Sequence, residues 1–149
     1  MKKFTMLALA GTLLSLGACT GFDQPDHVLN LAAKAVKEGD YATFASTLSE
    51  AAAQDLGSRA SFEALRSETA DIVSLKINSM QKIDEQIIST RERIQTIAIQ
   101  FSGASATNPA ALVGRAEVKC DIKVSLRVGP PRGQTQTQTN NCLITRIEK

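Results

Sequence analysis

The segment from Glu117 to Val128 alternates between apolar and polar residues without a break. A period of two is typical of an antiparallel strand with one buried face. The midpoint between Cys120 and Cys142 falls in Gly129-Pro130-Pro131-Arg132-Gly133, a run of turn-forming residues. Cysteine placement and turn composition therefore predict the same hairpin, in which Cys120 faces Cys142. The apolar face of its first strand would hold Val118, Cys120, Ile122, Val124, Leu126 and Val128.

The returning strand conflicts with this pattern. In the same register Gln136, Gln138 and Asn140 lie across from Leu126, Val124 and Ile122, so amide side chains share the apolar face. Either a bulge near residues 140–141 shifts the register, or the hairpin tip leaves the core and is partly solvated. If the fold encloses a cavity, the three amides are candidate ligand-binding residues.

Three helices are predicted before the strands, from apolar residues at helical spacing. The first begins at Pro25 and stops at Gly39. The second is capped by Asp40 and closed by Gly57. The third is capped by Ser61, with Phe62, Leu65 and Thr69 facing inward.

From Ile72 onward β-branched residues dominate. We expect a first strand ending at a turn over residues 84–86, a second strand over 87–101 and a loop over 102–109. In the second strand the alternation of apolar and polar residues is irregular near residues 93–95, which suggests a bulge there. The predicted fold is α+β, with three N-terminal helices packed on a curved four-stranded antiparallel meander.

The N-terminus reads as a secretory signal peptide. Lys2 and Lys3 precede the apolar run FTMLALAGTLLSL, which is too short to span a membrane. Leu16-Gly17-Ala18-Cys19 resembles the bacterial lipobox. That resemblance implies cleavage before Cys19, lipidation of its thiol and stable membrane anchoring by two or more acyl chains. Thr20, in place of Asp, favours the periplasmic face of the outer membrane. We expect a signal peptide at 1–18, a tether at 19–24 and one domain at 25–149.

Composition excludes several functional classes. Without residues 1–18 the chain has 15 basic and 15 acidic side chains and no cluster of Lys or Arg, so nucleic-acid binding is not expected. The one histidine, His27, is predicted on the surface at a helix start. No metal site and no cofactor is expected. In an oxidising periplasm Cys120 and Cys142 should form a disulfide.

The stretch VLNLAAKAVKEGDYATFASTLSE resembles uncharacterised lipoproteins of the nuclear transport factor two superfamily. The resemblance implies a cystatin-like, cone-shaped fold. Enzymes of that superfamily place an Asp or His base and Tyr or Asp donors in the cone. The candidates here, Asp71, Asp84, Asp121 and Tyr41, form no evident pair, so we expect no enzymatic activity.

Three functions follow as hypotheses. The first is a non-enzymatic, membrane-anchored accessory or protein-interaction domain with an envelope protein as partner and dimerisation as an option. The second is a small-molecule binder that uses the cone cavity, and the third is a component of a secretion or conjugation machine. The charged residues Arg91, Glu92 and Arg93 are expected on a solvated strand face.

Overall fold

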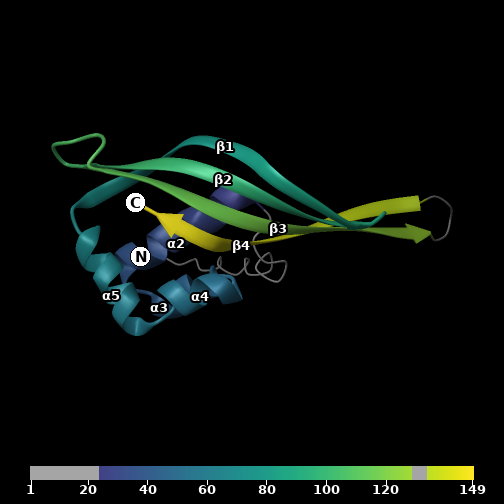
Figure 1. The fold of residues 1–149 in the computed structure, drawn as a ribbon, viewed down its shortest axis with the longest axis horizontal. Helices are drawn as coiled ribbons and strands as arrows, with labels where there is room; N and C mark the ends of the chain where they lie inside the picture. Colours follow the sequence, from purple (N-terminus) through teal and green to yellow (C-terminus); the bar gives the residue numbers. More distant parts are fainter. Residues whose placement is uncertain (1–23, 129–133) are drawn as a thin grey trace, which may run out of the picture.

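A computed structural model describes residues 24–128 and 134–149 of the 149-residue chain. It has an α+β architecture, in which four helices precede one open antiparallel sheet of strand order β1-β2-β3-β4 (Figure 1). The signal peptide at 1–18, Cys19, Thr20 and the turn at 129–133 lie outside the described residues.

Helix α2 (Pro25–Glu38) lies against the sheet as predicted. Pro25 occupies its first turn, and Gly39 ends it in the left-handed conformation with φ of 78°. The backbone N–H of Gly39 donates to the carbonyls of Ala35 and Val36. The spacing of the apolar residues places one face of α2 in the core: Val28, Leu29, Ala32, Ala35 and Val36.

The prediction of one helix between Asp40 and Gly57 is wrong. The segment forms two short helices, α3 (Tyr41–Ser46) and α4 (Glu50–Leu56), capped by Asp40 and Ser49. Between them Leu48 forms a parallel bridge to Ile144 of the last strand. Because the Thr47 carbonyl and the Ser49 N–H bond to Ile144, they cannot continue a helix. Helical spacing of the apolar residues did not reveal this interruption.

Helix α5 (Arg59–Glu68) begins one turn earlier than predicted. Its cap is Ser58, whose hydroxyl accepts from the backbone N–H of Ser61. Phe62 is fully buried and contacts the rings of Tyr41 and Phe44. These three rings join α3 and α5 to each other beneath α2.

Strand β1 (Ile72–Ser89) is longer than predicted and irregular. Its pairing with β2 (Glu92–Ser105) shifts at Val73, Asn78, Ile83 and Ile88, so that one extra residue appears in every five. The turn predicted at 84–86 is therefore wrong, since the strand continues to Ser89. The bulge predicted in the second strand near 93–95 is also wrong: the β1–β2 register shifts on both sides of this segment, but the extra residues, Ile83 and Ile88, belong to β1.

Strands β3 (Leu112–Val128) and β4 (Gln134–Glu148) form the predicted hairpin. Cys120 pairs with Cys142 and their sulfur atoms are bonded. The register is continuous from Cys120 to Val128, so no bulge lies near residues 140–141. The other alternative is therefore the one observed, with the hairpin leaving the core toward its tip. The bulge in this pair occurs instead beside Glu117, where Thr145 is left unpaired in the register.

The helices cover only part of the sheet. Buried sheet residues extend from Phe101 to Ile122 and Cys142 on the face toward the helices. Beyond them the strands continue away from the helices, and every residue of β1 and its turn from Asn78 to Arg91 is exposed (Figure 1). The fold therefore has a packed half and an extended, solvated half.

Candidate functional site

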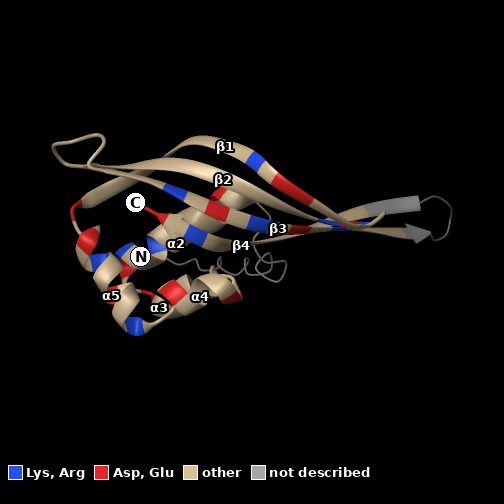
Figure 2. Ribbon diagram, in the orientation of Figure 1, with Lys and Arg blue, Asp and Glu red and all other residues tan. Residues whose placement is uncertain are grey.

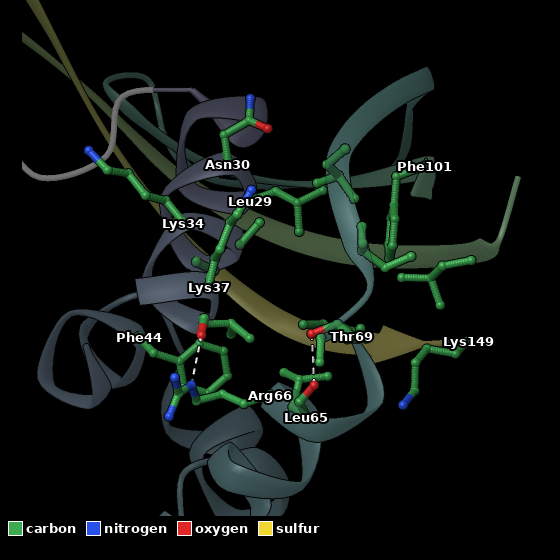
Figure 3. A pocket seen from close by; sticks show the side chains of 18 of the residues that line it. Leu29, Asn30, Lys34, Lys37, Phe44, Leu65, Arg66, Thr69, Phe101 and Lys149 are labelled. Carbon is green, nitrogen blue, oxygen red and sulfur yellow. Dashed lines mark hydrogen bonds between the residues drawn. The ribbon is translucent and has the colours of Figure 1, made fainter. Parts of the chain in front are cut away.

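A groove lies in the packed half, between α2, the end of α5 and the start of β1. Its volume is about 660 Å³. Figure 3 shows α2 on one side, with Arg66 below it and with Phe101 and Lys149 on the other. Apolar side chains from six different elements line it: Leu29, Phe44, Leu65, Leu75, Phe101 and Ile147.

The position of Phe101 depends on a glycine across the strand pair. Phe101 of β2 pairs with Gly114 of β3. A Cβ atom at Gly114 would lie 2.5 Å from Cζ of Phe101 and 2.8 Å from the carbonyl oxygen of Glu148. Only glycine leaves room for the ring there. The sheet thereby presents one aromatic side chain to the groove.

Four cationic side chains surround the groove: Lys34, Lys37, Arg66 and Lys149. Arg66 pairs with Glu63 at 3.2 Å, and Lys149 pairs with Glu68. The ion pairs among the described residues include neither Lys34 nor Lys37. Lys37 instead spans the gap to β1, where its Nζ donates to the carbonyl of Val73 at 3.2 Å. Within residues 24–128 and 134–149, the rim thus carries two positive charges without a carboxylate in an ion pair.

The backbone carbonyls beside the groove already have donors. Arg66 Nε donates to the carbonyl of Val36 at 3.1 Å, and the Thr69 hydroxyl donates to that of Leu65 at 2.8 Å (Figure 3). The carbonyl of Val73 accepts from Lys37. What remains for a ligand is the apolar surface, the ammonium groups and the polar side chains of Asn30, Ser67 and Ser74.

Of the three amides proposed from sequence as ligand-binding residues, Gln138 and Asn140 do not line this groove, and the side chain of Gln136 is not among those described. Gln136, Gln138 and Asn140 pair with Leu126, Val124 and Ile122 on the part of the hairpin that extends beyond the disulfide. Gln138 is exposed and donates to the side chain of Asn140 at 3.1 Å. The sequence carried a weak signal for the groove in Lys34 and Lys37, three residues apart on the helix that supplies Leu29. Locating it also required the position of α5, which the spacing of residues does not give.

The catalytic candidates are dispersed. Asp71 precedes β1, and Asp84 lies within β1 rather than at its end. Tyr41 is a helix-face residue whose hydroxyl donates to the carbonyl of Gly57. Asp121 of β3 is half-buried, lies 3.9 Å from Lys123 and has one carboxylate oxygen enclosed without a hydrogen-bond partner. None of these four lines the groove.

Two carboxyl groups have a pKa below the ordinary value, and both are exposed. The Thr43 hydroxyl and backbone N–H lower the pKa of Asp40, the cap of α3. Hydrogen bonds from Gln95 and Lys82 lower the pKa of Glu85 on the extended half of β1. These shifts reflect local hydrogen bonding. Residues 24–128 and 134–149 contain no cluster of three or more potential metal ligands, and His27 is exposed on α2.

Charged residues of both signs alternate along the sheet (Figure 2). Arg91 and Arg93 are exposed, as expected, and Glu92 is half-buried. Arg93 lies 3.6 Å from Glu85, and Glu92 lies 3.9 Å from Lys123. The extended half is therefore a surface of mixed charge.

Large apolar side chains are exposed mainly along β1. Of the seven large apolar residues exposed in the described part of the chain, five belong to it: Val73, Met80, Ile83, Ile87 and Ile88. A sixth, Leu126, lies on the extended part of β3 and is 42% exposed. Because Ile87 aligns through Arg93 with Ile122, it shares a sheet face with Leu126. This face is apolar in places yet uncovered by the helices.

No helix in the described part of the chain is long and apolar enough to cross a membrane. The chain matches no protein-family model, and neither a curated protein nor a solved structure matches it.

Proposed function

We propose that this protein is an envelope lipoprotein, anchored through Cys19 at the periplasmic face of the outer membrane. Its domain would act without catalysis, as an accessory or protein-interaction module. The lipobox resemblance supports the anchor. The order of helices followed by an antiparallel meander supports a cystatin-like architecture.

The proposed interaction surface is the extended part of the β3–β4 hairpin. The backbone N–H of Val124 donates to the carbonyl of Arg91 at 2.7 Å, at the end of β2. From there β3 and β4 continue as a two-stranded ribbon from Val124 to Val128 and from Gln134 to Gln138, which we call the arm. A two-stranded ribbon is at best marginally stable by itself in water. A partner that packs on the arm would supply the missing apolar contacts.

The partner would contact side chains rather than add a strand at β1. An outer strand offers unpaired backbone groups to another chain, but bulges disrupt such an edge. Strand β1 has four of them. The available contacts are the exposed apolar side chains Ile87 and Leu126 on one sheet face. Basic and acidic side chains lie beside them. This combination fits a folded envelope protein with a small apolar patch and a polar rim.

The anchor is tested by the substitution Cys19→Ser in the full-length chain. Loss of the thiol removes the acylation point, so we expect the protein to move from the membrane fraction to the soluble fraction. A Cys120→Ser control retains Cys19 and should stay with the membrane. Membrane attachment of the Cys19→Ser variant would refute the anchoring proposal.

The interaction is tested by a photo-crosslinking amino acid placed at Leu126 or at Ser125. These neighbours lie on opposite faces of β3, so we expect a discrete crosslinked product from position 126 and much less from 125. A product of twice the chain mass would identify a second copy as the partner. Because the two residues would share one interface, Ile87→Lys should abolish the product from position 126. Equal labelling from both faces would contradict the proposal.

A further inference from the structure

We infer that the groove between α2, α5 and β1 binds an amphiphile with one aliphatic chain and an anionic head group. This inference does not depend on the anchor or on the arm. It rests on the volume of the groove, the chemistry of its lining and the uncompensated charge at its rim.

The groove has the size of a small-molecule site. Its 660 Å³ lies within the range of about 300–1,000 Å³ found for ligand pockets. The floor consists of aliphatic side chains together with Phe44 and Phe101, contributed by both the helices and the sheet. An aliphatic chain in contact with this floor would remove apolar surface from water, worth about 0.8 kcal/mol for each buried methylene.

Apart from its charged residues, the lining has few polar side chains, namely Asn30, Ser67, Thr69 and Ser74, which favours a hydrocarbon chain over a sugar or an extended peptide. Such ligands carry many donors and acceptors, which need partners once they are removed from water. Here the carbonyls of Val36, Leu65 and Val73 already accept from Arg66, Thr69 and Lys37. A hydrocarbon chain makes no such demand.

The rim specifies the charge of the head group. Glu63 is the acidic residue among those lining the groove, and it already pairs with Arg66. Lys34 and Lys37 are one helical turn apart on α2, so one carboxylate or phosphate can approach both. A cationic head group would meet repulsion from the same two lysines.

Lys37 also connects the head-group position to the mouth of the groove. Its hydrogen bond is to Val73, which is the extra residue of the first bulge of β1 and has no partner in the register with β2. An anion at the rim would compete with the Val73 carbonyl for the ammonium group. Binding of the ligand would then be coupled to breaking of the hydrogen bond between Lys37 and Val73.

The test uses the full chain carrying Cys19→Ser, purified without detergent, and isothermal titration below the micelle concentration of each probe. Dodecanoate supplies the chain and the anion. Dodecyltrimethylammonium has the same chain with a cation, and inorganic phosphate supplies an anion alone. We expect dodecanoate to bind one per chain, the cationic probe to bind at least tenfold more weakly, and phosphate to show no heat of binding and no competition.

Two substitution pairs separate the head-group site from the apolar floor. Lys34→Gln with Lys37→Gln should weaken dodecanoate binding about tenfold, whereas the matched control, Lys76→Gln with Lys119→Gln, changes exposed strand lysines outside the groove and should have no effect. Ala33→Trp should fill the groove and abolish binding. Its control, Ala53→Trp, places the same side chain on an exposed site of α4.

Three results would overturn the inference. They are equal affinity for both dodecyl probes, unchanged dodecanoate affinity in the Lys34/Lys37 variant, and displacement of dodecanoate by inorganic phosphate. Thermal melting of each variant is measured alongside. An Ala33→Trp protein that melts like the parent and still binds dodecanoate would likewise exclude this groove.

Discussion

Leu48 and Ile144 join the helical layer to the edge of the sheet through the backbone. The N–H of Ile144 donates to the carbonyl of Thr47, and its carbonyl accepts from the N–H of Ser49, both at 2.8 Å. The side chain of Ile144 is fully buried, and that of Leu48 is nearly so. Ile144 therefore ties the edge strand β4 to the helical layer at one point, and this contact separates α3 from α4.

We expect Ile144→Ala to be among the most destabilising single substitutions in the domain. It removes a fully buried side chain, a change that typically costs about 2–5 kcal/mol. Urea unfolding followed by circular dichroism measures the loss. The neighbouring substitution Leu143→Ala, at a half-buried position, is the control and should cost clearly less. Equal losses of unfolding free energy in the two variants would show that the contact between Leu48 and Ile144 has no special importance for stability.

The disulfide should stabilise the domain by restricting its unfolded chain. A bridge between Cys120 and Cys142 closes a loop that includes the arm, and the chain-entropy model assigns about 3 kcal/mol to a loop of this length. We expect the Cys120→Ala, Cys142→Ala protein to unfold at lower urea concentration than the parent. Reductant should lower the midpoint of the parent and leave that of the double variant unchanged. A parent insensitive to reductant would contradict this expectation.

The hairpin was predictable because two independent signals agreed. Strict alternation around Cys120 and a Gly-Pro turn halfway to Cys142 are both local in sequence, and together they determine the register. The solvated tip was one of two alternatives. An amide such as Gln138 opposite Val124 requires either a shift of the strand register or exposure of this part of the hairpin to solvent. The structure shows exposure.

The first strand and the second helix were not predictable by the same means. In β1 an extra residue in every five destroys the alternation, so polar residues such as Asp84 looked like a turn. Between Asp40 and Gly57 the local pattern is helical throughout. The break at Leu48 arises from a hydrogen-bonded contact with Ile144, almost a hundred residues away. The groove likewise depends on how α5 packs, which local spacing does not encode.

Stability in acid should depend on Asp40. Its pKa in the folded chain is lowered by hydrogen bonds from Thr43, so the ionised carboxylate favours the folded state. That contribution is complete above the ordinary aspartate pKa of about 3.9 and is lost as the pH falls through the lower folded value. Asp40→Asn keeps a capping side chain without the ionisation. We expect the variant to lose less stability than the parent below about pH 4, as measured by urea unfolding across pH. Identical pH profiles would contradict the assignment.

Gly39 should tolerate a side chain poorly because of its backbone conformation. Its φ of 78° lies in the left-handed region, where a Cβ atom costs about 1–2 kcal/mol. A Cβ there would also lie 3.1 Å from the guanidinium carbon of Arg66, which holds the end of α2 through the Val36 carbonyl. We expect Gly39→Ala to lower the free energy of unfolding by about this amount, and Gly39→Asn to cost less because Asn enters this region more readily.

The same substitution gives a check on the groove. Because Arg66 lies on its rim, displacement of the guanidinium by the Cβ of Gly39→Ala should alter dodecanoate binding. Gly57→Ala, at a residue that does not line the groove, should not. A Cβ at Gly57 would lie 2.4 Å from the Ala53 carbonyl oxygen, so Gly57→Ala should also lose stability. It therefore serves as a control for the loss of stability expected in Gly39→Ala. If both variants lost binding in proportion to stability, global unfolding rather than the position of Arg66 would account for the effect.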